Sequence, residues 1–189
     1  MRRIVLAVLV LLGPALVAQA KDYQSSFRFT FSAPDAWLIM TKQELTTNPV
    51  FASADPGVKA KVESGSVEYF FNRVTSDATF TDIIDVKRGP GKIPSGPEAV
   101  KAECEAYAKA LAKATGRTLA LTTCEDRDVG ASKAFYVEGE GPTAGTVRMQ
   151  YQLTRPDGKL LFVTGTCKQG SLDKFRPDFE AIVRSIKFN

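Results

Sequence analysis

A tight turn between two strand-like runs constrains the fold of this chain more than any other feature. The runs 145–154 and 160–167 have the residue types of β-strands, and the turn RPDG at 155–158 has Pro second and Gly last, as a type I turn prefers. A turn this short cannot contain the crossover that parallel strands need, so the two strands must pair antiparallel. Two further strand-like runs, 117–124 and 132–139, precede them. The second half of the chain is therefore predicted to contain an antiparallel meander.

Two amphipathic helices flank this meander. The first is predicted from Pro97 to about Thr115, because proline favours the first turn of a helix and Gly116 occupies the position where glycine ends one. Its apolar stripe consists of Val100, Cys104, Tyr107, Ala108 and Leu111. The second is predicted as a short turn followed by a regular helix over 177–186, because a proline at 177 disfavours helical backbone at Arg176. Its stripe consists of Phe175, Phe179, Ile182, Val183 and Ile186.

The first half of the chain predicts strands around a long loop. One run alternates aromatic and polar residues, as a strand with one buried face does, and its aromatic residues are Phe27, Phe29 and Phe31. The runs 67–74 and 80–88 are also β-rich, and 89–97 is a Gly/Pro-rich loop. Residues 46–66 show no clear periodicity and predict an irregular loop, of a length that is often functional.

The order of these elements predicts an α+β fold. Strands, a long helix, an antiparallel meander and a final helix are typical of an antiparallel β-sheet covered by two main helices, an α/β/α sandwich. The chain shows no internal repeat and no second domain boundary, so residues 21–189 are predicted to form a single domain.

The first twenty residues have the pattern of a secretory signal peptide. Arg2 and Arg3 precede an unbroken apolar run at 4–12, and Ala-Gln-Ala at 18–20 matches a cleavage site. A transmembrane anchor is disfavoured because a Gly-Pro pair interrupts the apolar run long before the roughly 20 residues that a span needs. We therefore expect a periplasmic or secreted protein with no integral membrane segment after cleavage.

Composition excludes several function classes. The chain has no histidine, which removes Ser-His-Asp and Cys-His catalysis and histidine-based metal sites. Its formal net charge is +4, and two of the arginines belong to the predicted signal peptide, so the mature chain is near neutral. This balance gives no electrostatic argument for nucleic acid as a partner. We expect no enzyme activity and no cofactor.

Three cysteines in an exported chain predict one disulfide and one remaining thiol. Cys104 on the first helix and Cys124 on the following strand lie at similar distances from the turn between them, which favours their pairing. A Cys124–Cys167 bond remains the alternative, because strand order is not known from sequence. In a simple meander, Cys167 would lie at the opposite end of the sheet from Cys124, and we expect it to be buried and inert.

Two groups of carboxylates have candidate chemistry. Glu125, Asp126 and Asp128 are close enough in sequence to suggest a calcium loop, but they do not match the spacing of known loops, and a solvated hairpin turn is favoured. Glu138 and Glu140 share one face of a strand, as paired glycosidase carboxylates can, but solvent-facing side chains are the simpler interpretation. Neither group is expected to be a metal or catalytic site.

The two ends of the predicted domain resemble PsbP/Mog1-like domains. The opening pattern F-x-F-x-x-P-x-x-W ends in Trp37, the late hairpin has a DGK turn at 157–159, and a Phe-rich helix closes the chain. The residues that match these patterns are Phe29, Phe31, Pro34, Trp37, Asp157, Gly158, Lys159, Ser185, Ile186 and Phe188. The resemblance covers the order of elements over 25–188, although residue 36 is Ala where Gly is common and 46–66 has no counterpart. It implies a non-catalytic binding, adaptor or assembly module.

These observations predict an exported binding module of the bacterial cell envelope with an unknown protein partner. The alternatives are an immunity-type inhibitor of a periplasmic toxin and a binder of a small ligand. The candidate binding surface comprises Trp37 beside the long loop, and the basic loop residues Lys87, Arg88 and Lys92, which suit an anion. Core packing of Trp37 and a flexible connector at 87–92 are the competing interpretations.

Overall fold

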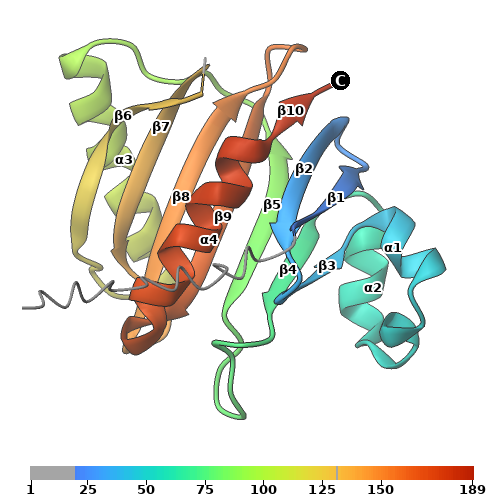
Figure 1. Cartoon of the computed structure of the whole chain (residues 1–189). Helices are drawn as coiled ribbons and strands as arrows, with labels where there is room; N and C mark the ends of the chain where they lie inside the picture. Colours follow the sequence, from blue (N-terminus) through green and yellow to red (C-terminus); the bar gives the residue numbers. More distant parts are fainter. Residues whose placement is uncertain (1–19, 131) are drawn as a thin grey trace, which may run out of the picture.

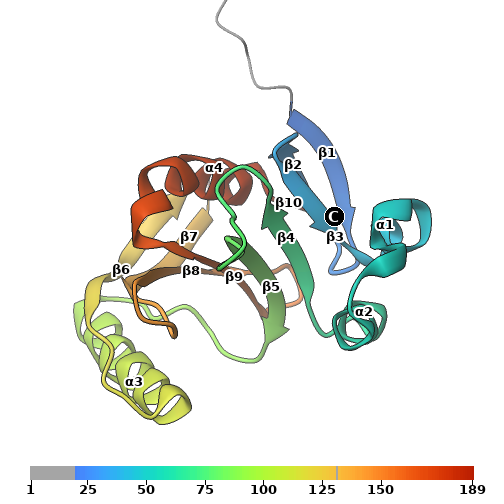
Figure 2. The same cartoon turned by 90° about the horizontal axis from the view of Figure 1, so that it is seen from below.

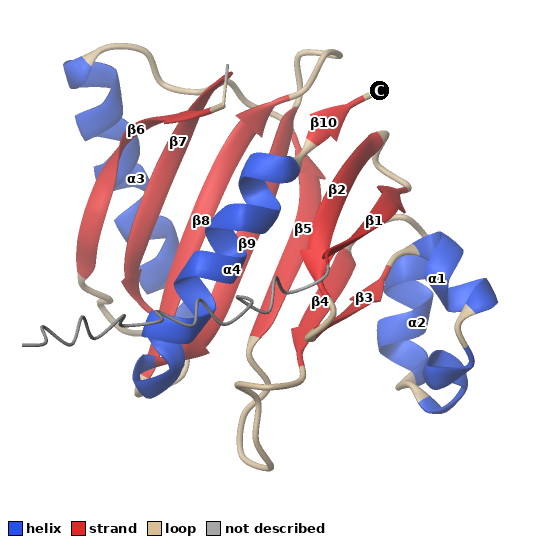
Figure 3. Cartoon of the chain, viewed as in Figure 1, coloured by secondary structure: helices blue, strands red, loops and turns tan. Residues whose placement is uncertain are grey.

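The computed structural model describes residues 20–130 and 132–189, and these form two antiparallel sheets and four α-helices (Figures 1 and 3). The large sheet consists, in spatial order, of β3 (Trp37–Met40), β4 (Glu68–Asn72), β5 (Ile83–Gly89), β9 (Leu160–Lys168), β8 (Thr146–Thr154), β7 (Ser132–Glu140) and β6 (Leu121–Val129). The small sheet consists of β1 (Ala20–Ser25), β2 (Phe29–Pro34) and β10 (Lys187–Phe188). The helices are α1 (Lys42–Thr47), α2 (Pro56–Glu63), α3 (Pro97–Thr115) and α4 (Leu172–Ser185), with 3-10 turns η1 (Pro49–Ser53) and η2 (Gln169–Ser171). Apart from Ala20, the predicted signal peptide lies outside the described residues.

The predicted meander is present as β6 to β9, with every neighbouring pair antiparallel. Strand β6 begins four residues later than predicted, because residues 117–120 form the connection from α3. The α+β class is confirmed, but the strands divide between two sheets instead of one. No helix in the described part of the chain is both long enough and apolar enough to span a membrane.

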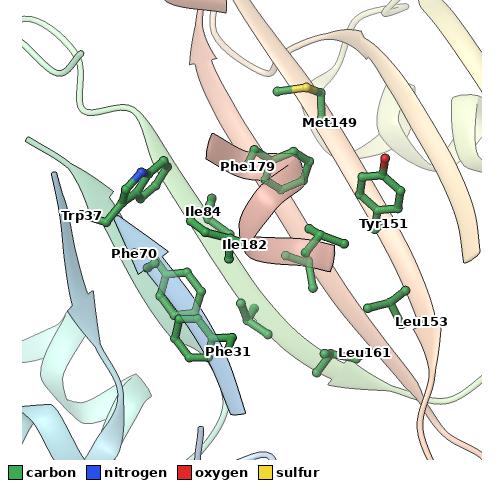
Figure 4. Close-up of a cluster of buried hydrophobic side chains, with 14 of the residues drawn as sticks. Phe31, Trp37, Phe70, Ile84, Met149, Tyr151, Leu153, Leu161, Phe179 and Ile182 are labelled. Carbon is green, nitrogen blue, oxygen red and sulfur yellow. The ribbon is translucent and has the colours of Figure 1, made fainter. Parts of the chain in front are cut away.

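One face of the large sheet forms the main core with α4 and the small sheet (Figure 4). Alternate residues of the central strands point to this face, among them Met149, Tyr151 and Val163. Phe27, Phe29 and Phe31 are all buried here, as the alternation in the sequence predicts. Burial of each large apolar side chain contributes about 1.5–3 kcal/mol, so this face accounts for much of the stability.

Helix α4 lies close to the sheet because of a glycine. A Cβ atom on Gly165 of β9 would lie 2.8 Å from Phe175 Cε1 and 3.1 Å from Phe179 Cδ2, too near for either ring to keep its place.

Helix α4 begins at Leu172, so the prediction of a start at Pro177 is wrong. Proline removes one helical hydrogen bond, but the buried phenylalanines on either side of it offset that loss.

The small sheet is fastened to the large one by a buried carboxylate. Glu68 of β4 accepts hydrogen bonds from the Ser25 hydroxyl at 2.7 Å and from the Ser26 backbone N–H at 2.8 Å. Burial raises the pKa of Glu68 above its ordinary value, and these hydrogen bonds oppose that rise. The turn between β1 and β2 is therefore held by polar contacts as well as by the core beneath it.

The prediction of an irregular loop at 46–66 is wrong, because most of this segment is helical. Helices α1 and α2 and the turn η1 enclose a second small core, whose buried members are Met40, Phe51 and Val62. Each of these helices begins with a capping side chain, Thr41, Asn48 or Asp55, which accepts a backbone N–H. Helices this short hold too few turns to show an apolar stripe, so the periodicity of the sequence missed them.

Candidate binding groove

The second face of the large sheet is only partly covered. Helices α1 and α2 lie over β3 and β4, and α3 lies beside β6, all on the side opposite α4 (Figure 2). Between α3 and the central strands is a groove of about 520 Å³, which we call the α3 groove. Its wall is formed by Glu103, Ala106, Tyr107 and Ala110 of α3, and its floor by Asp85, Lys87, Arg88, Arg148, Gln150, Gln152, Phe162 and Thr164.

The groove exists because α3 contacts the edge of the sheet and not its centre. The helix packs on β6, and every one of its residues is at least partly exposed to solvent. The disulfide between Cys104 and Cys124 bonds α3 to β6. On the groove side, the Arg148 Nε–H donates to the hydroxyl of Tyr107 at 3.1 Å. The predicted bounds of this helix and its Gly116 cap are confirmed, but its stripe is half-buried and not a core face.

The floor of the groove is polar, unlike the core face of the same strands. Gln150 and Gln152 alternate along β8 with core residues and are themselves more than nine-tenths buried. The Gln150 Nε2 amide donates to the Thr164 hydroxyl on β9 at 2.8 Å. Phe162, beside Thr164 on the same face of β9, is partly exposed. Such a floor offers amide donors and acceptors beside an aromatic surface, which suits a ligand or chain segment with both polar and apolar groups.

Charges of both signs lie around the floor. Lys87 forms an ion pair with Asp85 at 2.6 Å, and both residues belong to β5. Arg148 and Glu103 add one charge of each sign. Mixed charges of this kind select the orientation of a partner more than they contribute to affinity.

The basic residues of the predicted binding surface lie in two different parts of the structure. Lys87 and Arg88 line the α3 groove, whereas Lys92 is exposed in the loop after β5. The Arg88 guanidinium lies 4.6 Å from the centroid of the Phe27 ring and donates to the carbonyl of Gly65. The 87–92 segment is thus partly a strand and partly a loop.

The assignment of Trp37 to a surface is wrong. The side chain is 2% exposed and lies on the core face of β3 (Figure 4). Its ring packs against Phe175. Its Nε1–H donates to Asp178 Oδ2 at 3.0 Å, which satisfies the one polar atom of the indole. The long segment beside it folds into helices with their own core, so no loop surface forms around Trp37.

The favoured cysteine pairing, Cys104–Cys124, is confirmed. Cys167 is free and buried, and burial raises the pKa of its thiol to about 12. The expected reason for its isolation is wrong: the strand registers place Cys124 level with Thr164, three residues along β9 from Cys167, and not at the opposite end of the sheet. Cys167 points to the core face and Cys124 to the α3 side, so the sheet itself separates them.

The first group of carboxylates, Glu125, Asp126 and Asp128, lies in strand β6 and not in a turn. Glu125 pairs with Arg127 and Asp128 with Lys133. Asp126 is exposed. Within the described residues, no group of three or more metal-ligating side chains of the His, Cys, Asp and Glu types comes together.

The two carboxylates of the second group, Glu138 and Glu140, lie in different environments. Glu138 is 9% exposed and receives two hydrogen bonds from the Arg176 guanidinium, each at 2.6 Å, so its expected exposure to solvent is wrong. Arg176 holds the pKa of Glu138 below its ordinary value, whereas burial raises the pKa of Tyr136, which donates to the same carboxylate. Glu140 is exposed, as expected. A carboxylate already paired with arginine on a helix is a structural link between α4 and β7.

Sequence reasoning missed most of the groove. The sequence pattern puts Tyr107 in an apolar stripe and assigns no role to Arg148, Gln150, Gln152 or Phe162. The usable signal was the alternation of Gln150 and Gln152 with Met149, Tyr151 and Leu153, which shows a strand with one polar face in the middle of a meander.

The comparisons with known proteins bear on the fold. No protein-family model matches the sequence, and no curated protein matches it either. The chain is similar to the solution structure of cyanobacterial PsbP (CyanoP) from Synechocystis sp. PCC 6803, with a TM-score of 0.58 and 16% identity over 94% of this chain and 96% of that one. A mutant of the protein Mog1 aligns with a TM-score of 0.48 and 10% identity, over 90% of this chain and 96% of that one. The expected fold resemblance is confirmed: the chain has a PsbP-like fold.

Proposed function

We propose that this chain with a PsbP-like fold is a non-catalytic binding module of the bacterial cell envelope, and that it binds a protein partner in the α3 groove. The observation that carries the proposal is the contrast between the two faces of β8 and β9. One face is apolar and covered by α4, and the other has buried glutamines and threonines under an open groove. Recognition sites typically combine apolar and aromatic surface with a small number of precisely placed polar groups, and the glutamines are such polar groups in this groove.

A protein partner suits the groove better than a small ligand does. Its floor follows the strands β5, β9 and β8 and is bounded by α3 on one side. The glutamine amides can donate to and accept from the backbone of a docked segment, and Phe162 and Tyr107 offer apolar contact. Charges of both signs would fix the direction of that segment.

Two alternative functions are also non-catalytic binding functions. The groove volume of about 520 Å³ is within the range of small-molecule sites, which supports a small-ligand binder. An immunity-type inhibitor of a periplasmic toxin would use the same stable scaffold and a surface of this size. Export is supported by the disulfide, since disulfides persist in oxidising compartments.

The test is a native mass spectrum of the unreduced protein taken from its own cell envelope, compared with two variants. Ala106→Trp fills the groove from the wall of α3, whereas Ala102→Trp places the same bulk at an exposed position of α3 outside the groove lining. We expect a co-purifying protein mass with the native chain and with Ala102→Trp, and its loss with Ala106→Trp. Retention by both variants would place binding elsewhere, and a co-purifying mass of a few hundred daltons would favour the small-ligand alternative.

A further inference from the structure

A second cavity, of about 540 Å³, lies at the end of the large sheet where β5 stops and β9 begins. It is lined by residues 88–91 on one side and by Arg155 and residues 157–159 on the other. The two segments meet because β5 and β9 pair antiparallel up to Gly89 and Leu160. The basic loop noted in the sequence is therefore brought opposite a second basic segment, the β8–β9 turn.

Arg155 is unusual among the residues that line this cavity, because it is buried without a full set of hydrogen-bond partners. Its side chain is 6% exposed, yet its hydrogen bonding is incomplete. One terminal nitrogen lies 3.1 Å from Asp157 Oδ2, the other donates to the carbonyl of Phe27 at 3.3 Å, and the Nε–H has no partner among the described residues. A buried guanidinium is stable only when its donors and its charge are matched, and Asp157 is the one carboxylate that lines the cavity.

Arg88 is held beside Arg155 by a shared residue. Its guanidinium stacks on the ring of Phe27, and Arg155 donates to the carbonyl of that same residue. Lys159 adds a third cation to the lining. Three cations therefore face the single carboxylate of Asp157, so the cavity has an excess positive charge that a doubly charged ligand would neutralise.

We propose that this cavity, lined by Arg88, Arg155 and Lys159, binds a phosphate monoester. Planar guanidinium groups bond oxyanions through two parallel N–H groups, and Lys159 acts as a point charge. Gly158 has a φ of +75°, and a Cβ atom there would meet no heavy atom within 4 Å, so the turn leaves open space beside the cations. The cavity is larger than a phosphate group, which leaves room for the organic part of the ester.

The test titrates the unreduced protein with inorganic phosphate and with glycerol 3-phosphate, following the backbone amide signals of Gly89, Gly91 and Gly158 by NMR. We expect both probes to saturate with dissociation constants of about 1 mM or lower and the ester to bind more tightly than phosphate. A parallel titration with vesicles that contain phosphatidic acid distinguishes a lipid headgroup from a soluble ester as the source of the phosphate.

Four variants assign the site. Asp157→Asn removes the competing carboxylate and is expected to tighten binding about fivefold, while Lys159→Gln weakens it about fivefold, since one unit charge at about 4 Å in water corresponds to about 1 kcal/mol. Arg155→Lys keeps the charge but loses the paired N–H groups and is expected to weaken binding about tenfold. Lys92→Gln is the matched control, because Lys92 is exposed in the same loop and outside the lining, and it should leave binding unchanged.

Thermal unfolding of each variant separates loss of binding from loss of folding. The proposal is overturned if neither probe shifts the three glycine signals up to 20 mM, a concentration about twentyfold above the expected constant. It is also overturned if Lys92→Gln weakens binding as much as Lys159→Gln does, because that result indicates attraction to net charge alone. Arg88 lines both this cavity and the α3 groove, so the four substitutions are made at residues outside the groove lining, and their outcome is independent of the proposed function.

Discussion

The two long helices, α3 and α4, are held to the large sheet by different means. Helix α4 buries four apolar side chains against the core face. Helix α3 is longer, but all its residues are at least partly exposed, and a disulfide bonds it to the edge strand. Length therefore does not decide how tightly a helix packs: the apolar side chains of its stripe and the face that it meets do.

The two faces of β8 and β9 differ in polarity, and this difference leaves one of them open for binding. The core face of β8 and β9 is apolar, so α4 gains free energy by covering it. The opposite face is polar in its centre, so α3 would gain little by moving over it and would have to match the buried glutamines and threonines. A covalent link at the edge holds the helix while the polar floor stays accessible.

The largest expected effect comes from truncating the packed face of α4. Phe179→Ala should lower the free energy of unfolding by about 3–5 kcal/mol, because it leaves a cavity between α4 and β9. Leu111→Ala, the matched truncation on the half-buried stripe of α3, should cost about 1 kcal/mol, since part of that side chain already meets water. Urea unfolding of both variants measures the difference. Equal losses would show that α3 packs as tightly as α4.

The next effect comes from breaking the link at α3. Cys104 and Cys124 are 20 residues apart in sequence, and replacing both with serine should lower the free energy of unfolding by about 3 kcal/mol through the lost constraint on the unfolded chain. Hydrogen exchange should locate the structural part of the effect. We expect the amides of α3 to lose protection, while those of α4 change only as far as global stability falls. Loss of protection in both helices to the same degree would contradict an edge-tethered α3.

A smaller effect is expected at the polar link of α4. Glu138→Gln should lower the free energy of unfolding at pH 7 by about 1–2 kcal/mol, because the Arg176 guanidinium loses its charged acceptor. The pKa of Glu138 is lowered in the folded state, mainly by Arg176, so its contribution is complete above the unfolded pKa and is lost as the pH falls through the folded pKa. The native chain should therefore lose more stability than the variant between pH 7 and pH 3.

The control for that link is the exposed pair on the same helix. Arg184 and Glu180 are four residues apart, and the arginine side chain is mostly exposed. Glu180→Gln should change the free energy of unfolding by less than about 0.5 kcal/mol at either pH. Unfolding curves at both pH values for the two variants test the contrast, and a larger effect at Glu180 would reverse it.

The smallest expected change concerns the thiol beneath α4. Cys167 is fully buried, and the pKa of its thiol is raised to about 12, so almost no thiolate exists at neutral pH. An aromatic disulfide reagent at pH 8 should titrate no thiol in the folded, unreduced protein and one thiol after unfolding in guanidinium chloride. Rapid reaction in the folded state would show that α4 opens readily, which would weaken its contrast with α3.

Helix bounds and turns were predictable from the sequence where they depend only on residues close together in the chain. The bounds of α3 followed from Pro97 and Gly116, and the β8–β9 hairpin followed from its RPDG turn. The start of α4 was missed because the penalty at Pro177 is local, whereas the burial that offsets it involves a strand neighbour at Gly165. Trp37 was misplaced for a similar reason: its environment is set by Phe175 and Asp178, more than 130 residues away in the chain.

By itself, the sequence determined the bounds of α3, the antiparallel pairing of the meander, the α+β class and the favoured disulfide, because each depends on turns, caps and spacing between near neighbours in the chain. Only the tertiary structure decided which face of each strand is covered. The central position of β9 comes from its pairing with β5, which begins 77 residues earlier (Ile83 against Leu160). The same pairing places the glutamines of β8 in a groove and brings Arg88 beside Arg155. Burial depends on which surfaces meet, and that choice minimises the exposed apolar area of the whole chain, so no local pattern contains it.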